Sequence, residues 1–178
     1  MATATPKPGQ YAIDALRSEI TFTTKHMFGL GSVRGSFRMR GGTVSLAEPP
    51  TASRVHAVAD ATSFDTGNKN RDRQVLSRTL LDTATYPDIV FASDGAELDS
   101  AGAWTLRGQL TAHGVDAPLT FTVAKAEVHG DEITVQATAT VDRYAHGVTK
   151  LKGMAARSLQ LTATIRAHRS NGSLGPQE

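Results

Sequence analysis

Residues 133–141 read ITVQATATV, a strict alternation of apolar and polar side chains. In an extended strand, every second side chain lies on the same face, so Ile133, Val135 and Val141 share one face with the two alanines. The opposite face carries mainly threonine, a β-branched residue that suits a pleated, solvent-facing surface. The stretch therefore predicts an antiparallel strand with one apolar face and one wet face.

The same alternation recurs in other parts of the chain. It is regular in WTLRGQLTA (104–112), LTFTV (119–123) and LQLTATIRA (159–167), and less regular at 20–22, 33–39 and 55–59. Segments rich in Gly, Pro and Asp separate these runs and predict turns. Many strands of similar length at such spacing are typical of a β-sandwich or a β-barrel, so we expect an all-β fold.

The apolar face of these strands carries small as well as large residues. An eight-stranded barrel has an interior wide enough for side chains alone or for one small ligand. The small residues on the inward parity are Gly35, Gly108, Ala137, Ala139, Ala163 and Ala167. They favour an internal cavity, although the periodicity fits a fully packed barrel equally well.

One segment departs from the strand pattern. Residues 71–93 read RDRQVLSRTLLDTATYPDIVFAS, with Val75, Leu76 and Leu80 at helical spacing and a possible side-chain cap at 68–70. Pro87 cannot continue a helix, and an apolar run typical of a strand follows it. We expect an amphipathic helix of about three turns. In a β domain such a helix needs an apolar surface, so it should cover the mouth of the barrel as a lid.

The length and composition indicate one ordinary globular domain. The chain has 178 residues, and we assign 10–169 to a single domain and 1–9 and 170–178 to disordered tails.

The charge pattern disfavours nucleic-acid binding, because Lys and Arg number 19 against 17 Asp and Glu and are scattered along the chain. No apolar run approaches the roughly 20 residues that span a bilayer, so we expect no stable membrane insertion. Residues 1–14 show no secretory signal pattern, and we expect a cytoplasmic protein.

Motifs for catalysis or metal binding are missing from the sequence. There is no cysteine, no HExxH or His-x-His pair among the six histidines, and no Gly-x-Ser-x-Gly elbow. We therefore expect no catalytic residue, metal or cofactor. One alternative is an enzyme acting on an apolar substrate inside the barrel, which would need a polar residue on the inward parity. Another is a stress-response module that acts through its surface and has no lipid ligand.

Four segments in order along the chain, 11–37, 70–93, 106–121 and 142–148, resemble the successive signatures of the YceI-like family. Members of that family are bacterial, lipocalin-like β-barrels that bind polyisoprenoids such as isoprenoid quinones. The resemblance implies an extended antiparallel eight-stranded barrel, a helix at its mouth and a lipid tail in a central tunnel. Family members often pair, so a homodimer is possible.

The chain departs from the family pattern near the mouth. Arg17 stands where the family usually has His before Ser, and Gln74 replaces the usual His of the helix. Leu80 and Leu81 replace an aromatic pair. Because these changes lie in the mouth region, the headgroup preference of the family does not transfer to this chain.

Energetics favour a long apolar ligand. Micromolar affinity requires about 8 kcal/mol, and each buried methylene returns ~0.8 kcal/mol before ordering costs, so well above about ten carbons must be buried. We therefore expect a non-catalytic protein that binds, transports or stores an isoprenoid or other long-chain lipid.

The candidate ligand-contacting residues are Phe22, Met27, Phe28, Phe37, Phe91, Trp104, Leu106, Leu119 and Phe121 on the wall, Leu76, Leu80 and Leu81 at the mouth, and Tyr144 and His146 for a headgroup. Plain core packing is the alternative for the wall residues, and a role in a turn is the alternative for Tyr144 and His146.

Overall fold

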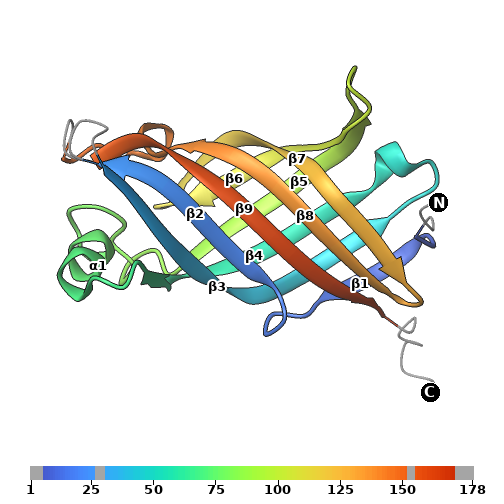
Figure 1. Cartoon of the computed structure of the whole chain (residues 1–178), viewed down its shortest axis with the longest axis horizontal. Coiled ribbons are helices and arrows are strands. Elements are labelled where there is room, and N and C mark those ends of the chain that lie inside the picture. Colours follow the sequence, from blue (N-terminus) through green and yellow to red (C-terminus); the bar gives the residue numbers. More distant parts are fainter. Residues whose placement is uncertain (1–5, 27–30, 152–154, 171–178) are drawn as a thin grey trace.

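The computed structural model describes residues 6–26, 31–151 and 155–170, and this part of the chain forms an antiparallel β-barrel with one α-helix. The predicted all-β, lipocalin-like fold is confirmed (Figure 1). The elements are β1 (Gly9–Ile13), β2 (Glu19–His26), β3 (Gly31–Leu46), η1 (Pro50–Ala52), β4 (Arg54–Asp65), α1 (Lys69–Leu76), β5 (Asp88–Leu98), β6 (Trp104–Ala112), β7 (Val115–His129), β8 (Glu132–Asp142), η2 (Arg143–His146) and β9 (Ala155–Arg169). The sheet closes because β3 pairs with both β2 and β4.

The barrel has eight rows of strands, and one of the rows is divided in two. β1 pairs with 43–46 of β3 and with 167–169 of β9. β2 pairs with the remaining parts of the same two strands, at 31–37 of β3 and 155–164 of β9. β1 and β2 therefore occupy a single row that residues 14–18 interrupt, which explains how nine strands form the predicted eight-stranded barrel.

Bulges let several strands continue much further than their sequence alternation suggests. The pairing register shifts at Met39/Gly41 of β3, at Ser93/Gly95 of β5 and at 123/125 of β7. Each extra residue moves the inward face to the other parity. In β7 the lining residues change from Phe121 and Val123 to Ala126 and Val128, so its regular alternation covers only part of the strand.

The helix is shorter than predicted. As expected, the Asn68 side chain caps its start by accepting a hydrogen bond from the backbone N–H of Arg71 at 3.0 Å. The helix ends at Leu76 because Ser77 is extended and its hydroxyl donates to the carbonyl of Gln74. Leu80 consequently lies in the following turn rather than on the helix. α1 packs on β4, and we call its end of the barrel the α1 end (Figure 1).

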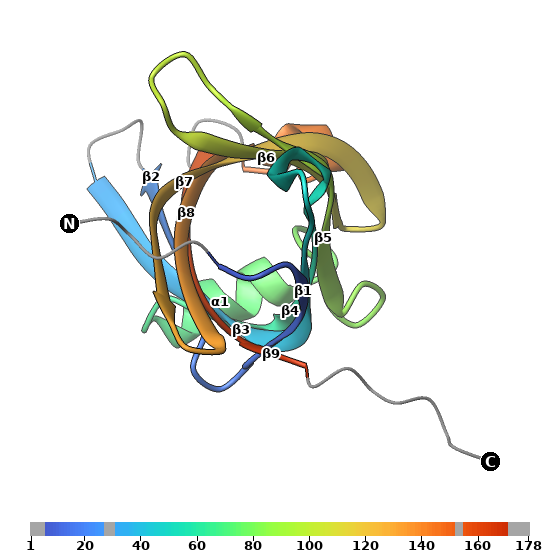
Figure 2. The same ribbon diagram turned by 90° about the vertical axis from the view of Figure 1, so that its right-hand side faces the viewer.

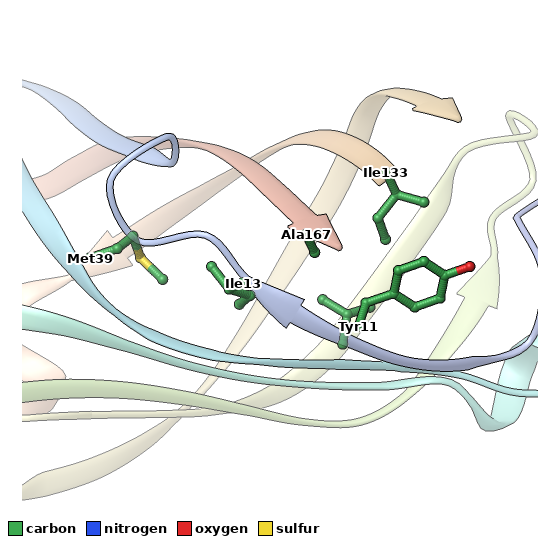
Figure 3. Close-up of a cluster of buried hydrophobic side chains, with 6 residues drawn as sticks. Tyr11, Ile13, Met39, Ile133 and Ala167 are labelled. Atoms are coloured by element: carbon green, nitrogen blue, oxygen red, sulfur yellow. The ribbon is translucent and has the colours of Figure 1, made fainter. Parts of the chain in front are cut away.

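Buried apolar side chains of the barrel form two clusters, and some members of each cluster also line the inner cavity. One lies at the opposite end of the barrel, which we call the terminal end because the first and last described residues lie there (Figures 1 and 3). It consists of Tyr11, Ile13, Met39, Val44, Ile133 and Ala167. The other consists of Phe91, Leu110, Leu119, Phe121, Ala137 and Ala139.

Candidate functional site

A cavity of about 470 Å³ lies inside the barrel. Its volume falls within the range of small-molecule pockets. On β8 its lining extends from Ile133 to Val141, which is about 27 Å along the strand at ~3.4 Å per residue. The cavity is therefore elongated along the barrel, and Figure 2 looks along it from the terminal end.

The wall of this cavity is almost wholly apolar. The polar or charged residues that line it are Glu48, Ser53, Glu127, Arg143 and His146. The apolar lining comes from every strand except β1 and includes Ile20, Phe37, Met39, Val55, Phe91, Trp104, Phe121, Val135, Leu161 and Ile165. A depression of similar size on the outer face of β7–β9 is lined mainly by threonines and Gln160 instead. The inner cavity is the one suited to an apolar ligand.

Alanines, rather than glycines, give the cavity its room. Ala137 and Ala163 line it, as predicted from their parity, whereas Ala139 and Ala167 are buried in the two apolar clusters and do not line it. The expectation for Gly35 and Gly108 was wrong. A Cβ at Gly35 would collide with the ring of Phe22, and one at Gly108 would collide with the backbone of β5. The Phe22 ring and the β5 backbone already fill the space beside these two glycines, so the glycines do not enlarge the cavity.

The structure brings several of the predicted contact residues together around the cavity. These are Phe37, Leu81, Phe91, Trp104, Leu106, Phe121 and His146. Ligand contact by these side chains stays a prediction. Met27 and Phe28 lie outside the described residues.

Other predicted residues lie off the cavity wall. Phe22 stacks on Phe64 with ring centroids 5.2 Å apart. Leu119 packs in the second apolar cluster, and Leu80 is buried in the turn after α1. Leu76 is the last, partly buried residue of α1.

Tyr144 also lies off the lining. Its ring contacts the guanidinium groups of Arg143 and Arg157, whose central carbons lie 5.0 and 4.8 Å from the ring centroid. These contacts give Tyr144 a packing role on η2.

Several lining residues escaped the sequence analysis. Leu161 and Val135 lie on the predicted inward parity, but the predicted contact residues on the wall were mainly aromatic. Val44 and Val128 lie beyond bulges, where a simple alternation places them on the wrong face. If each long strand is allowed one change of parity, the sequence pattern places both valines on the inward face.

At the α1 end, a buried arginine holds the chain that follows η2. The guanidinium of Arg143 donates to the carbonyl oxygens of Val148, Lys150 and Ala156, each at 2.8 Å. Burial lowers the pKa of Arg143 below its ordinary value. The hydrogen bonds compensate for removing the cation from water, because buried charges need close polar partners.

Two histidines connect the segments that meet at the same end. Nδ1 of His146 donates to the carbonyl of Val115 at 2.8 Å, and Nδ1 of His113 donates to the carbonyl of His146 at 3.0 Å. The ring of His113 packs edge-on against Tyr86, with centroids 5.1 Å apart. The β6–β7 hairpin, η2 and the segment after α1 are thereby joined around the end that Leu81 lines.

At the terminal end, the first described residues lie against the opening. Pro6 and Pro8 line the cavity, and Figure 2 shows this segment running across the ring of strands to β1. The Tyr11 hydroxyl donates to the carbonyl of Lys7 at 2.7 Å, and Arg169 donates to that of Pro8 at 2.9 Å. Residues 6–9, assigned to a tail from the sequence, are therefore anchored, while 1–5 and 171–178 lie outside the described residues.

Within residues 6–26, 31–151 and 155–170, no three or more His, Asp or Glu side chains are grouped in a way that could hold a metal ion. No helix in the same ranges has the length and apolar character needed to cross a bilayer.

The chain is similar to several known proteins. The family model described as YceI-like domain matches residues 11–167. Protein YceI of Escherichia coli O157:H7 is 34% identical over 132 residues, which are 71% of this chain and 62% of that protein. A UPF0312 protein of Pseudomonas syringae pv. tomato is 31% identical over 126 residues, which are 70% of this chain and 60% of that protein. The matched part thus spans less than two thirds of these relatives.

Solved structures show the same fold. BcnA of Burkholderia cenocepacia has a TM-score of 0.74 and 21% identity, over 86% of this chain and 98% of its own. A polyisoprenoid binding domain from Saccharophagus degradans has a TM-score of 0.69 and 18% identity, over 90% of this chain and 98% of its own. At these identities the likeness establishes the architecture.

Proposed function

Because this chain belongs to the YceI-like family, we propose that its barrel binds a long-chain isoprenoid lipid and transports or stores it without catalysing a reaction. The observation that supports the proposal most directly is the elongated apolar cavity of about 470 Å³. A polyisoprenoid binding domain with the same architecture adds support.

The shape and lining of the cavity suit an extended hydrocarbon chain. The wall offers apolar contacts from Ile133 to Val141 on β8, opposite Phe37 and Val55 from β3 and β4. Burial of roughly ten to fifteen methylenes at ~0.8 kcal/mol each would supply about 8–12 kcal/mol before the costs of ordering are subtracted. Micromolar or tighter binding is therefore within reach of apolar contacts alone.

A binding titration tests this function. Protein that has been extracted to remove lipid is titrated with a fluorescent polyprenol, and an unlabelled polyprenol is then added as competitor. We expect saturable binding at micromolar concentration or below, displaced by the long competitor but not by a short-chain alcohol. Absence of saturable binding by folded, extracted protein would contradict the proposal.

The enzyme alternative makes a different prediction. The polar side chains on the cavity wall at the α1 end are Arg143 and His146, and both donate hydrogen bonds to backbone carbonyls. We expect a bound polyprenol to be recovered with unchanged mass after prolonged incubation. A product of altered mass that depends on His146 would favour an enzyme. The cytoplasmic location and a possible homodimer stay predictions, which cell fractionation and analytical ultracentrifugation can test.

A further inference from the structure

We propose that the α1 end of the cavity selects a lipid whose polar end donates a hydrogen bond, such as a long-chain alcohol, and that Nε2 of His146 accepts this bond. The inference rests on the proposed function, since it names the polar group of the lipid in the same cavity. It assigns to His146 a role in specificity in addition to its place in η2.

The hydrogen bond on the other side of the ring determines what Nε2 can do. Nδ1 of His146 lies 2.8 Å from the carbonyl oxygen of Val115. A carbonyl oxygen can only accept, so Nδ1 carries the hydrogen. In the neutral ring, Nε2 then has a lone pair and no hydrogen, which makes it an acceptor. A ligand group that meets this atom must donate.

The acceptor has no partner within the described chain. His146 is 4% exposed, and it is one of the residues that line the cavity. The described residues contain no fully enclosed side-chain nitrogen or oxygen that lacks a hydrogen-bond partner. Nε2 of His146 makes no hydrogen bond in this part of the chain, so it must retain contact with open space. The open space that His146 lines is the cavity, so we infer that Nε2 faces it, where a buried acceptor gains from a donor.

The surroundings favour a neutral polar group over an anion. The nearest buried cation in the sequence is Arg143, and its guanidinium donates to three backbone carbonyl oxygens. Val141 and Val148 also line the cavity beside this part of the chain. A phosphate or carboxylate would lose its hydration here and would compete with carbonyls for the guanidinium, whereas a hydroxyl needs one acceptor. The hydrocarbon tail would then extend toward the terminal end, along Val135 and Ile133.

A matched pair of ligands tests the inference. Geranylgeraniol and geranylgeranyl methyl ether share one hydrocarbon tail, but only the alcohol can donate a hydrogen bond. Isothermal titration of lipid-extracted full-length protein should give an affinity for the alcohol about three- to tenfold higher than for the ether, as expected for one net hydrogen bond.

Two substitutions of His146 distinguish the role of Nδ1 from the role of Nε2. In His146→Asn the amide NH₂ can still reach the Val115 carbonyl, but the Nε2 acceptor is gone, so the preference for the alcohol should disappear. In His146→Gln the longer amide places a carbonyl oxygen near the Nε2 position, so part of the preference should return. Leu161→Ala, elsewhere on the wall, is the control and should weaken both ligands alike without changing their ratio. Thermal unfolding of each variant verifies that it is folded.

The outcomes distinguish the inference from the proposed function. Equal binding of alcohol and ether by the parent protein, or a preference that persists in folded His146→Asn, overturns the inference and leaves lipid binding intact. Failure of both ligands to bind the parent overturns the proposed function and the inference with it. Loss of the preference in His146→Asn together with its partial return in His146→Gln supports the inference.

Discussion

Filling the cavity from its wall should abolish lipid binding without harming the fold. Ala163 lies on β9, lines the cavity, and is paired with Ile20 and Ala137 on the neighbouring strands. In Ala163→Phe, a ring would enter space that we assign to the lipid tail. If it excludes about four methylenes, the binding free energy falls by about 3 kcal/mol, which is more than a hundredfold in affinity. Because the ring enters open apolar space, the unfolding temperature should stay the same or rise.

The assay is a titration with fluorescent polyprenol, combined with thermal unfolding of the same samples. Thr162→Phe, at the adjacent position of β9 and on the outer face, is the matched control and should bind as the parent does. Parent-like affinity in folded Ala163→Phe would refute the reasoning, because it would place the lipid outside this cavity. Equal losses in both variants would point to a general disturbance of β9 instead.

The remaining predictions concern the fold around the site. In Gly35→Ala the new Cβ would collide with the ring of Phe22, and chemical denaturation should show a loss of about 1–3 kcal/mol. Arg143→Met leaves three backbone carbonyl oxygens without their donor, and the same measurement should show a loss of about 2–5 kcal/mol. The guanidinium of Arg157 lowers the pKa of Asp142 through two hydrogen bonds, so this pair adds stability above the ordinary carboxyl pKa of about 4 and loses it as the pH falls through the lowered value. Unfolding temperatures measured from pH 7 to pH 2 should therefore fall less steeply in Arg157→Leu, and an unchanged slope would contradict this assignment.

The regular strands could be predicted from the sequence because their pairing has no irregularity on the inner face. β8 pairs with β9 without a register shift, and its alternation from Ile133 to Val141 is visible in the printed sequence. β3 and β5 were harder, since bulges after Met39 and Ser93 change which parity faces inward. A bulge depends on the pairing of two strands, which a single stretch of sequence does not show.

The end of the helix was missed for a local reason. The apolar spacing of Val75, Leu76 and Leu80 suggests one continuous face, but the Ser77 hydroxyl competes for the carbonyl of Gln74 and ends the helix. The turn that follows still supplies Leu81 to the cavity, so the expected cover of the barrel end comes from a different part of the segment.

The sequence predicted an apolar cavity wall correctly, but it did not predict which individual residues of η2 line the cavity. Large apolar residues on the inward parity, such as Trp104 and Phe121, do line the cavity. The sequence could not show which of Tyr144 and His146 lines the cavity, because a 3-10 helix of four residues has no periodic pattern. Only the three-dimensional structure shows that His146 lines the cavity while the ring of Tyr144 contacts two arginines.

Native mass spectrometry of the protein purified from its own host tests lipid binding most directly. We expect an adduct whose mass, after release and fragmentation, identifies one long-chain isoprenoid per chain, and we expect Ala163→Phe to lack it. Parent protein that never retains a lipid, and that also fails to take up an added polyprenol, would contradict the account.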